Sequence, residues 1–176
     1  MSTPSSGSGL KTFTAVIAVI FGLVLLIGGI YLAVLGGSWY YIIAGLLFIA
    51  TAVLLQKLKS TALIVYALLV LGTVVWGLWE VGSDFFALAP RLDILGLFGL
   101  WLLIPAVTRG FDNAKSAKLV LTGSLAVTIA VMIYAVFNDP QEIRGELSSK
   151  QPATAQSIPG VADGDWPAYG RTQSGL

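Results

Sequence analysis

An uninterrupted apolar stretch near the start of the chain restricts the fold more than any other feature. Phe13–Leu35 contains 23 residues and no charged side chain. At about 1.5 Å per residue, a helix of this length crosses a hydrocarbon core of roughly 30 Å. A cleaved signal peptide is the alternative, but its apolar region has only about 7–15 residues before a cleavage site. The stretch is longer than that, and others follow it, so it predicts a first transmembrane helix.

Four more apolar stretches follow the first one. They lie at about Trp39–Leu55, Thr61–Val81, Leu92–Val107 and Leu119–Phe137. Hydrophobic residues make up 56% of the 176 residues and charged residues only 11%, whereas about a quarter of the residues in a soluble domain are charged. The sequence therefore predicts an all-α membrane protein in which residues 12–137 form a bundle of five transmembrane helices.

Small residues recur inside these stretches and predict close packing of the helices, because they let two backbones approach each other. These residues are Gly28, Gly29, Gly45, Gly72, Gly77, Gly96, Gly99, Gly123, Ala126 and Ala130.

Two residue types are absent, and their absence excludes several kinds of chemistry. The chain has no cysteine and no histidine. Without cysteine there is no disulfide, thiolate nucleophile or iron–sulfur cluster. Without histidine the chain lacks the usual haem ligand and the commonest general base. The net charge of +1 gives no indication of nucleic-acid binding, and catalysis by these residues alone is not expected.

The charges between the stretches predict the orientation in the membrane. One side holds six basic residues and a single acid, Asp112, while the other side holds most of the acids. Because basic loops stay in the cytoplasm, we expect a cytoplasmic N-terminus and a periplasmic C-terminus. The six basic residues are Lys11, Lys57, Lys59, Arg109, Lys115 and Lys118.

The two ends of the chain differ in composition from its apolar part. Residues 1–11 form a predicted cytoplasmic tail, and its Ser/Gly/Pro-rich part, Met1–Leu10, is expected to be disordered. Hydrophobicity falls from Asn138 onward, so residues 138–164 are interpreted as a periplasmic linker. The aromatic segment of residues 165–176 resembles the first strand of a further domain that the chain does not contain.

Acids, a base and aromatic residues gather between the third and fourth stretches, in WGLWEVGSDFFALAPRLD (Trp76–Asp93). This is where any role beyond anchoring is expected. Several structural interpretations compete with a functional one. Arg91 could form an ion pair with Glu80 or Asp93, and Asp93 could cap the helix that follows it. Asp84 could cap a short turn at Phe85–Leu88. Separately, the aromatic residues at positions 39–41 are typical of a membrane–water interface.

Four segments together resemble one family. They are GGSWYYIIAG (Gly36–Gly45), LGTVVWGLWEVGSDFFALAPRLDIL (Leu71–Leu95), FNDPQEI (Phe137–Ile143) and DWPAYGRTQSG (Asp165–Gly175). They are similar to membrane-bound quinoprotein dehydrogenases of the glucose and quinate/shikimate type. The resemblance implies a helical anchor followed by a periplasmic β-propeller that holds pyrroloquinoline quinone and calcium. It also implies that electrons from sugar oxidation pass to ubiquinone. The propeller is missing, so no catalytic residue is carried over, and the chain is expected to be a truncated product, inactive alone.

Within this family setting, the charged cluster predicts a site for the ubiquinone headgroup. The apolar run Ile94–Thr108 has 15 residues, about 22 Å of helix against a core of roughly 30 Å. Polar residues before it must therefore reach towards the hydrocarbon, where they need partners. We expect Arg91 to donate hydrogen bonds and Glu80 or Asp93 to relay protons, in a pocket walled by Trp76 and Trp79.

Two other functions remain open on the sequence alone. The chain could be a separate small anchor subunit of a polyol or sugar dehydrogenase, although the aromatic segment at its end argues against this. It could also be a small transporter. A transporter needs a polar path along several helices, yet the first, second and fifth stretches contain no ionisable residue.

Overall fold

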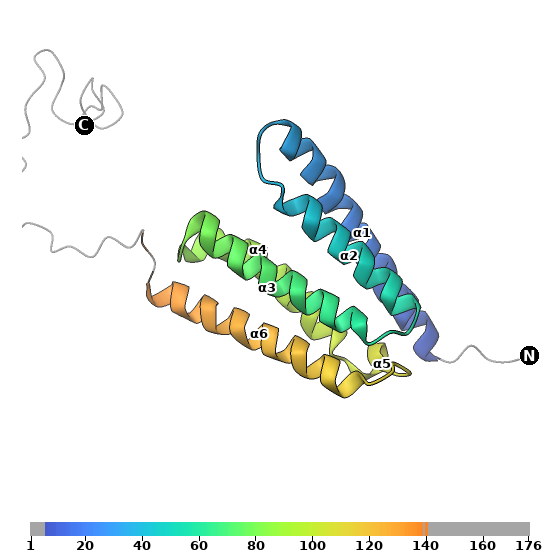
Figure 1. Ribbon diagram of the computed structural model, residues 1–176. Coiled ribbons are helices and arrows are strands. Elements are labelled where there is room, and N and C mark those ends of the chain that lie inside the picture. Colours follow the sequence, from blue (N-terminus) through green and yellow to red (C-terminus); the bar gives the residue numbers. More distant parts are fainter. Residues whose placement is uncertain (1–5, 139, 141–176) are drawn as a thin grey trace, which may run out of the picture. The chain divides into compact units, whose positions relative to one another are not determined.

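The computed structural model describes residues 6–138 and 140 of the chain. This part consists of five long helices and one short one (Figure 1). The helices are α1 (Ser6–Val34), α2 (Tyr40–Gln56), α3 (Thr61–Val81), α4 (Phe85–Leu102), α5 (Pro105–Thr108) and α6 (Ala114–Phe137). By length and composition, α1, α3, α4 and α6 can each cross a membrane. Helix α2 is apolar and has 17 residues. The expected all-α five-helix membrane architecture is confirmed.

Some helices pack against their neighbours in the sequence, and others pack against helices that are distant in the sequence. Helices α1 and α2 form an antiparallel pair, and α2 packs on α3. Helix α3 lies beside both α6 and α4, and α4 also contacts α6, as Figure 1 shows for the green and orange ribbons. The short helix α5 contacts α1. A single cluster of buried residues joins all of these helices, with the rings of Phe48, Tyr66 and Phe98 in contact with one another.

Glycines set the distance between α1 and α2. A Cβ atom added to Gly45 would lie 2.6 Å from the backbone nitrogen of Leu26 and 2.7 Å from the carbonyl oxygen of Gly22. One added to Gly29 would lie 2.7 Å from the nitrogen of Ile42. The two backbones are therefore in direct contact, which no residue with a side chain would allow.

The other predicted glycines differ in what surrounds them. A Cβ at Gly77 would meet Leu88, and one at Gly99 would meet Leu125, in both cases at 2.9 Å. Other glycines have nothing within 4 Å of such an atom, so their predicted packing role is wrong in this part of the chain. These are Gly28, Gly72, Gly96 and Gly123.

Buried hydroxyl groups are paired inside the bundle. The Tyr66 side chain is fully buried, and its hydroxyl donates to the carbonyl oxygen of Leu95 at 2.7 Å, which ties α3 to α4. Thr51 and Thr128 instead donate to carbonyl oxygens one turn earlier in their own helices. Since an unpaired hydroxyl is costly in an apolar interior, these bonds make polar side chains compatible with the membrane.

The fourth helix differs from the predicted stretch at residues 92–107. Helix α4 begins at Phe85, where the carboxylate of Asp84 accepts a hydrogen bond from the Ala87 N–H at 3.0 Å. Asp84 therefore caps a full helix and not the short turn at Phe85–Leu88. Pro90 lies inside α4 and supplies no N–H to it, a defect that transmembrane helices tolerate.

Helix α4 also ends earlier than predicted, and Asp93 lies inside it. Ile104 is extended, with ψ of 129°, because the ring of Pro105 disfavours the helical conformation in the residue before it. The helix accordingly ends at Leu102, and α5 follows as a separate turn. Asp93 lies in the interior of α4, so the interpretation of Asp93 as a helix cap is wrong.

Both outer helices are longer than predicted. Helix α1 begins at Ser6, so the expectation of a disordered Met1–Leu10 is wrong for residues 6–10. The Thr14 hydroxyl donates to the Leu10 carbonyl and the Lys11 ammonium to the Arg109 carbonyl, which hold this turn in place. Helix α6 begins at Ala114 and not at Leu119. The predicted linker and the segment at residues 165–176 lie outside the described residues, apart from positions 138 and 140.

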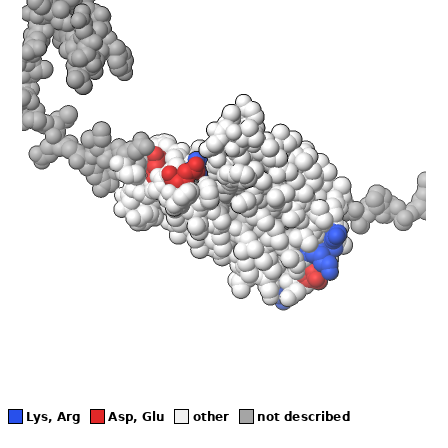
Figure 2. All heavy atoms as spheres, turned by 45° about the horizontal axis from the view of Figure 1, so that its top comes forward, with Lys and Arg blue, Asp and Glu red and all other residues white. Residues whose placement is uncertain are grey.

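On the face shown in Figure 2, mostly acidic residues lie at one end of the bundle and mostly basic residues at the other. At the basic end, the carboxylate of Asp112 accepts a hydrogen bond from the Ser60 N–H at 2.9 Å, joining the α2–α3 and α5–α6 connections. This hydrogen bond above all lowers the pKa of Asp112 below its usual value. Asp112, the only acid predicted on this side, therefore links the two connections at the basic end of the bundle.

Candidate functional site

An ion pair joins the ends of α3 and α4. Glu80 is the penultimate residue of α3, and Arg91 lies six residues after the first residue of α4. Nη1 of Arg91 is 3.1 Å from Oε2 of Glu80, and the two side chains are 27% and 35% exposed. The contact is an ion pair by distance, and the buried Nη1 makes no well-aligned hydrogen bond in the described chain.

A row of aromatic rings runs beside this ion pair. Tyr40, the first residue of α2, stacks on Trp76 with ring centres 5.8 Å apart and 21° between the planes. Trp76 in turn contacts Trp79 at 5.0 Å, and Tyr40 contacts Tyr41 at 5.3 Å. The row places flat surfaces from α2 and α3 against each other.

The hydroxyl of Tyr40 is held in one orientation. It lies within hydrogen-bond distance of the Thr73 hydroxyl. Because Thr73 already donates to the Leu69 carbonyl at 2.7 Å, Tyr40 must be the donor and Thr73 the acceptor. The Tyr40 oxygen is therefore left as an acceptor, and its ring is fixed against Trp76.

A cavity of about 610 Å³ lies between α1, α2 and α4, next to the ion pair. Helix α1 contributes Phe21, α2 contributes Tyr40 and Tyr41, and α4 contributes Pro90 and Arg91, among other apolar residues. Several lining side chains, such as those at positions 24 and 86, are largely exposed at the surface of the bundle. The cavity is therefore an open, mostly apolar crevice with a guanidinium and two phenol groups in its wall.

The five predicted site residues are only partly brought together. Arg91 lines the cavity and pairs with Glu80, as one of the open interpretations stated. Trp76 touches the cavity wall through Tyr40, and its Nε1 is buried with no acceptor among the described residues. Trp79 is 75% exposed and does not line the cavity. Asp93 is exposed and lies two positions after Arg91, on a different side of α4.

Two of the residues in the cavity wall were not predicted for it. Tyr40 and Tyr41 were interpreted as interface aromatics, because their cluster at the start of a helix is typical of that setting. Their approach to Arg91 depends on how α2 is rotated about its axis. The one available signal was their presence in the GGSWYYIIAG segment.

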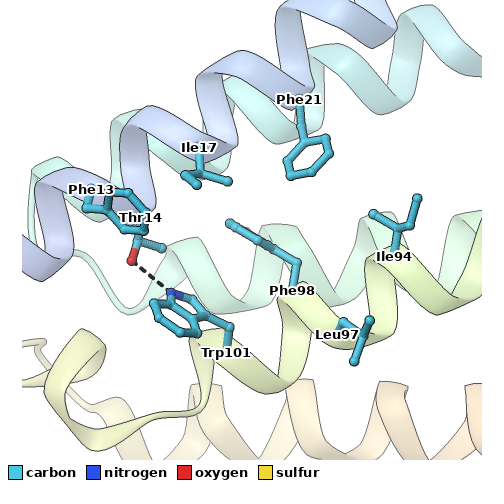
Figure 3. A pocket seen from close by; sticks show the side chains of 8 residues that line it. All are labelled: Phe13, Thr14, Ile17, Phe21, Ile94, Leu97, Phe98 and Trp101. Carbon is cyan, nitrogen blue, oxygen red and sulfur yellow. Dashed lines mark hydrogen bonds between the residues drawn. The ribbon is translucent and has the colours of Figure 1, made fainter.

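A second cavity, of about 360 Å³, lies further along α1 and α4, two of the three helices that line the first (Figure 3). Its wall includes Phe13, Ile17, Leu97 and Phe98. The two polar groups that Figure 3 shows there, Thr14 and Trp101, are bonded to each other: the indole Nε1 donates to the threonine Oγ1 at 3.0 Å. The second cavity thus presents a hydrocarbon surface.

Within the part of the chain that the structure describes, no three His, Cys, Asp or Glu residues come together as a metal site. The chemistry that this region can support is hydrogen bonding, proton transfer and aromatic packing next to the bilayer.

Comparison with known proteins shows the family to which the chain belongs. It is 61% identical over 176 residues to quinoprotein glucose dehydrogenase A of Acinetobacter calcoaceticus, which covers the whole chain and 22% of that protein. It is 51% identical over 167 residues to quinoprotein glucose dehydrogenase of Escherichia coli, covering 94% of the chain and 21% of that protein. The chain belongs to the family of membrane domains of the quinoprotein dehydrogenases. It is a membrane protein, and it spans about a fifth of the length of these relatives.

The same family of membrane domains also includes proteins of a different size. The chain is 37% identical over 103 residues to the glycerol dehydrogenase small subunit of Gluconobacter thailandicus, covering 57% of the chain and 81% of that subunit. No protein-family model matches the chain, and no solved structure does.

Proposed function

We propose that the chain anchors a quinoprotein dehydrogenase, of the glucose type, in the bacterial inner membrane and docks ubiquinone there. The membership of the family supports the anchoring role. The cavity beside Arg91 supports the docking role, because it combines a cationic donor with aromatic walls in a region open to the bilayer. The pyrroloquinoline quinone of the parent family would be held by the propeller.

The observation that carries the quinone proposal is the state of the Arg91 guanidinium. A guanidinium has five N–H donors, and the pair with Glu80 engages only Nη1, without hydrogen-bond alignment. In the described chain the guanidinium therefore has N–H groups left to donate. A quinone carbonyl oxygen placed in the cavity would accept a hydrogen bond from one of them while its ring packs on the side chains of Tyr40 and Tyr41.

The reaction needs two electrons and two protons for each ubiquinone. Sugar oxidation in the catalytic part of the enzyme supplies both electrons, and each quinone carbonyl becomes a hydroxyl. Arg91 stabilises the negative charge that develops on the carbonyl oxygen, since a charged donor binds an anionic acceptor more strongly than a neutral one. Glu80 lies against Arg91 at the partly exposed end of α3 and passes protons from water towards the site. Asp93 lies on another side of α4 and takes no part.

Binding of ubiquinone to the chain itself tests this proposal. In lipid nanodiscs, a labelled short-tail ubiquinone should bind saturably, and Arg91→Gln should weaken binding about tenfold or more, as loss of a hydrogen bond to a charged group costs roughly 1.5–3 kcal/mol. Arg109→Gln is the matched control, because Arg109 lies at the opposite, basic end. Equal binding by wild type and Arg91→Gln would refute the proposed site.

The proposed orientation has the N-terminus in the cytoplasm and the C-terminus in the periplasm, where the catalytic propeller lies. The charge difference between the two ends of the bundle supports it. Reporter fusions after Ser38 and Asp84 should give a periplasmic signal, and fusions after Lys57 and Lys115 a cytoplasmic one. The same alternation with opposite signals would reverse the orientation and move the quinone site to the cytoplasmic side.

A separate small anchor subunit is the second candidate, and the match to 81% of a glycerol dehydrogenase small subunit favours it. The coding sequence beyond Leu176 distinguishes the two candidates. A reading frame that continues into a propeller domain supports an anchor within one chain. A stop codon with a separate dehydrogenase gene beside it supports the subunit.

A further inference from the structure

The two cavities between α1 and α4 are neighbours. Phe21 and Ile94 line both of them. The Phe21 ring packs against Phe48 at 5.8 Å and against Phe98 at 6.3 Å between ring centres. Phe21 and Ile94 therefore mark the place where the cavity that contains Arg91 adjoins the hydrocarbon-lined cavity shown in Figure 3.

The distance along the crevice is that of several isoprenoid units. From Arg91 to Trp101 the helix α4 advances ten residues, or about 15 Å. An isoprenoid unit adds four bonds of about 1.5 Å to the chain, and because an extended chain zigzags at its bond angles, each unit advances it by roughly 5 Å. A tail that begins beside Arg91 would pass Phe21 within its first units and reach the indole of Trp101 after about three.

We infer that the second cavity binds the isoprenoid tail of the ubiquinone whose headgroup docks beside Arg91. The inference rests on the proposed function: the first cavity binds the quinone headgroup, and the second binds the tail of the same molecule. It follows from the fact that Phe21 and Ile94 line both cavities, which makes the cavities neighbours, and from the apolar lining of the second one. There the polar atoms of Thr14 and Trp101 satisfy each other, so the wall favours a hydrocarbon. The rings of Phe21, Phe98 and Trp101 provide flat contacts for the methyl branches and double bonds of the tail.

The expected gain in affinity is moderate. The tail leaves lipid and not water, so only packing contributes and the hydrophobic effect between water and hydrocarbon does not. We therefore expect the second cavity to strengthen the binding of a ubiquinone with four isoprenoid units about three- to fivefold, and to leave binding of a ubiquinone with one unit unchanged.

Filling the second cavity tests the inference. Leu97 lines it and is 68% exposed, so Leu97→Trp should occupy the space without disturbing the core. Leu100 lies on the same helix, is 53% exposed and does not line the cavity, which makes Leu100→Trp the matched control. Labelled ubiquinones with one and four units are bound to the chain in nanodiscs. Comparing each variant with wild type for the same quinone removes the effect of partitioning into lipid.

Each outcome has a distinct meaning. The inference predicts that Leu97→Trp weakens binding of the four-unit quinone about three- to fivefold and leaves that of the one-unit quinone unchanged, while Leu100→Trp changes neither. If Leu97→Trp does not change binding of the four-unit quinone, the inference is overturned. The same conclusion holds if mass spectrometry of the intact protein shows that this variant has lost a bound phospholipid, because the second cavity then binds lipid instead of the tail. Failure of the headgroup site is seen separately, as one-unit binding that Arg91→Gln does not change.

Discussion

Arg91→Ala should lower the rate of ubiquinone reduction about tenfold to a hundredfold in an enzyme that joins this membrane domain to its catalytic domain. The substitution removes the donor for the quinone carbonyl, and a hydrogen bond to a charged group is worth roughly 1.5–3 kcal/mol. It also leaves the Glu80 carboxylate without its partner. Reduction of a water-soluble dye, which takes electrons without entering the membrane, should stay within about twofold of wild type.

Three further variants separate the roles of the two ion-pair partners. Arg91→Lys keeps the charge and should restore part of the rate, since lysine lacks the planar set of donors. Glu80→Gln should slow ubiquinone reduction and leave the dye reaction intact, because it removes the group that passes protons. Arg109→Ala should change neither rate. If dye and ubiquinone reduction fall together, or if neither changes in a folded protein, the ion pair is structural and the quinone binds elsewhere.

Gly45→Ala should strongly destabilise the bundle. The added methyl group would lie 2.6 Å from the nitrogen of Leu26 and 2.7 Å from the carbonyl oxygen of Gly22. Both are backbone atoms, so neither can rotate away, and α1 must separate from α2. Overpacking of this kind costs about 1–3 kcal/mol or more in free energy of unfolding. The measurement is the thermal unfolding midpoint of the purified protein in detergent.

Gly72→Ala is the control for this substitution. Gly72 also lies in a long helix, and nothing lies within 4 Å of a Cβ atom added to it. Alanine is the better helix former by about 1 kcal/mol, so the Gly72 variant should be as stable as wild type or slightly more so. Because helix propensity favours alanine at both positions, an equal loss of stability in both variants would mean that the contact between α1 and α2 does not determine the effect.

The number and type of the helices could be predicted because a membrane imposes a minimum length on an apolar segment. Helix α3 has the predicted bounds, Thr61–Val81, and α2 differs by one residue at each end. The start of α4 could not be found in this way. Pro90 and Arg91 are poor candidates for a transmembrane helix, and they suggested a helix that begins after them, at Leu92. The carboxylate of Asp84 instead starts the helix seven residues earlier than predicted.

The candidate site was predictable to the extent that charge near a membrane needs a partner. The cost of placing Arg91 close to hydrocarbon led to the pair with Glu80, which the structure contains. The aromatic wall was not predictable. Helices that are apolar on all sides do not reveal which side faces a neighbour. The rotation of α2 about its axis, which brings Tyr40 onto Trp76, could therefore not be predicted from the sequence. For the same reason Trp79 was assigned to the wall of a pocket that it does not line.

The crevice between α1 and α4 is open along its length at the surface of the bundle, where side chains such as those of Leu97 and Phe86 are exposed. A ligand dissolved in the bilayer therefore reaches it by diffusion in two dimensions and never crosses water. Its relevant concentration is that in the lipid, which for a membrane-soluble carrier is far higher than its concentration in the whole cell. Under such conditions a dissociation constant of about 1 mM, or about −4.1 kcal/mol, gives useful occupancy. A shallow site that binds weakly also releases its product quickly, so the openness of this crevice favours turnover over retention.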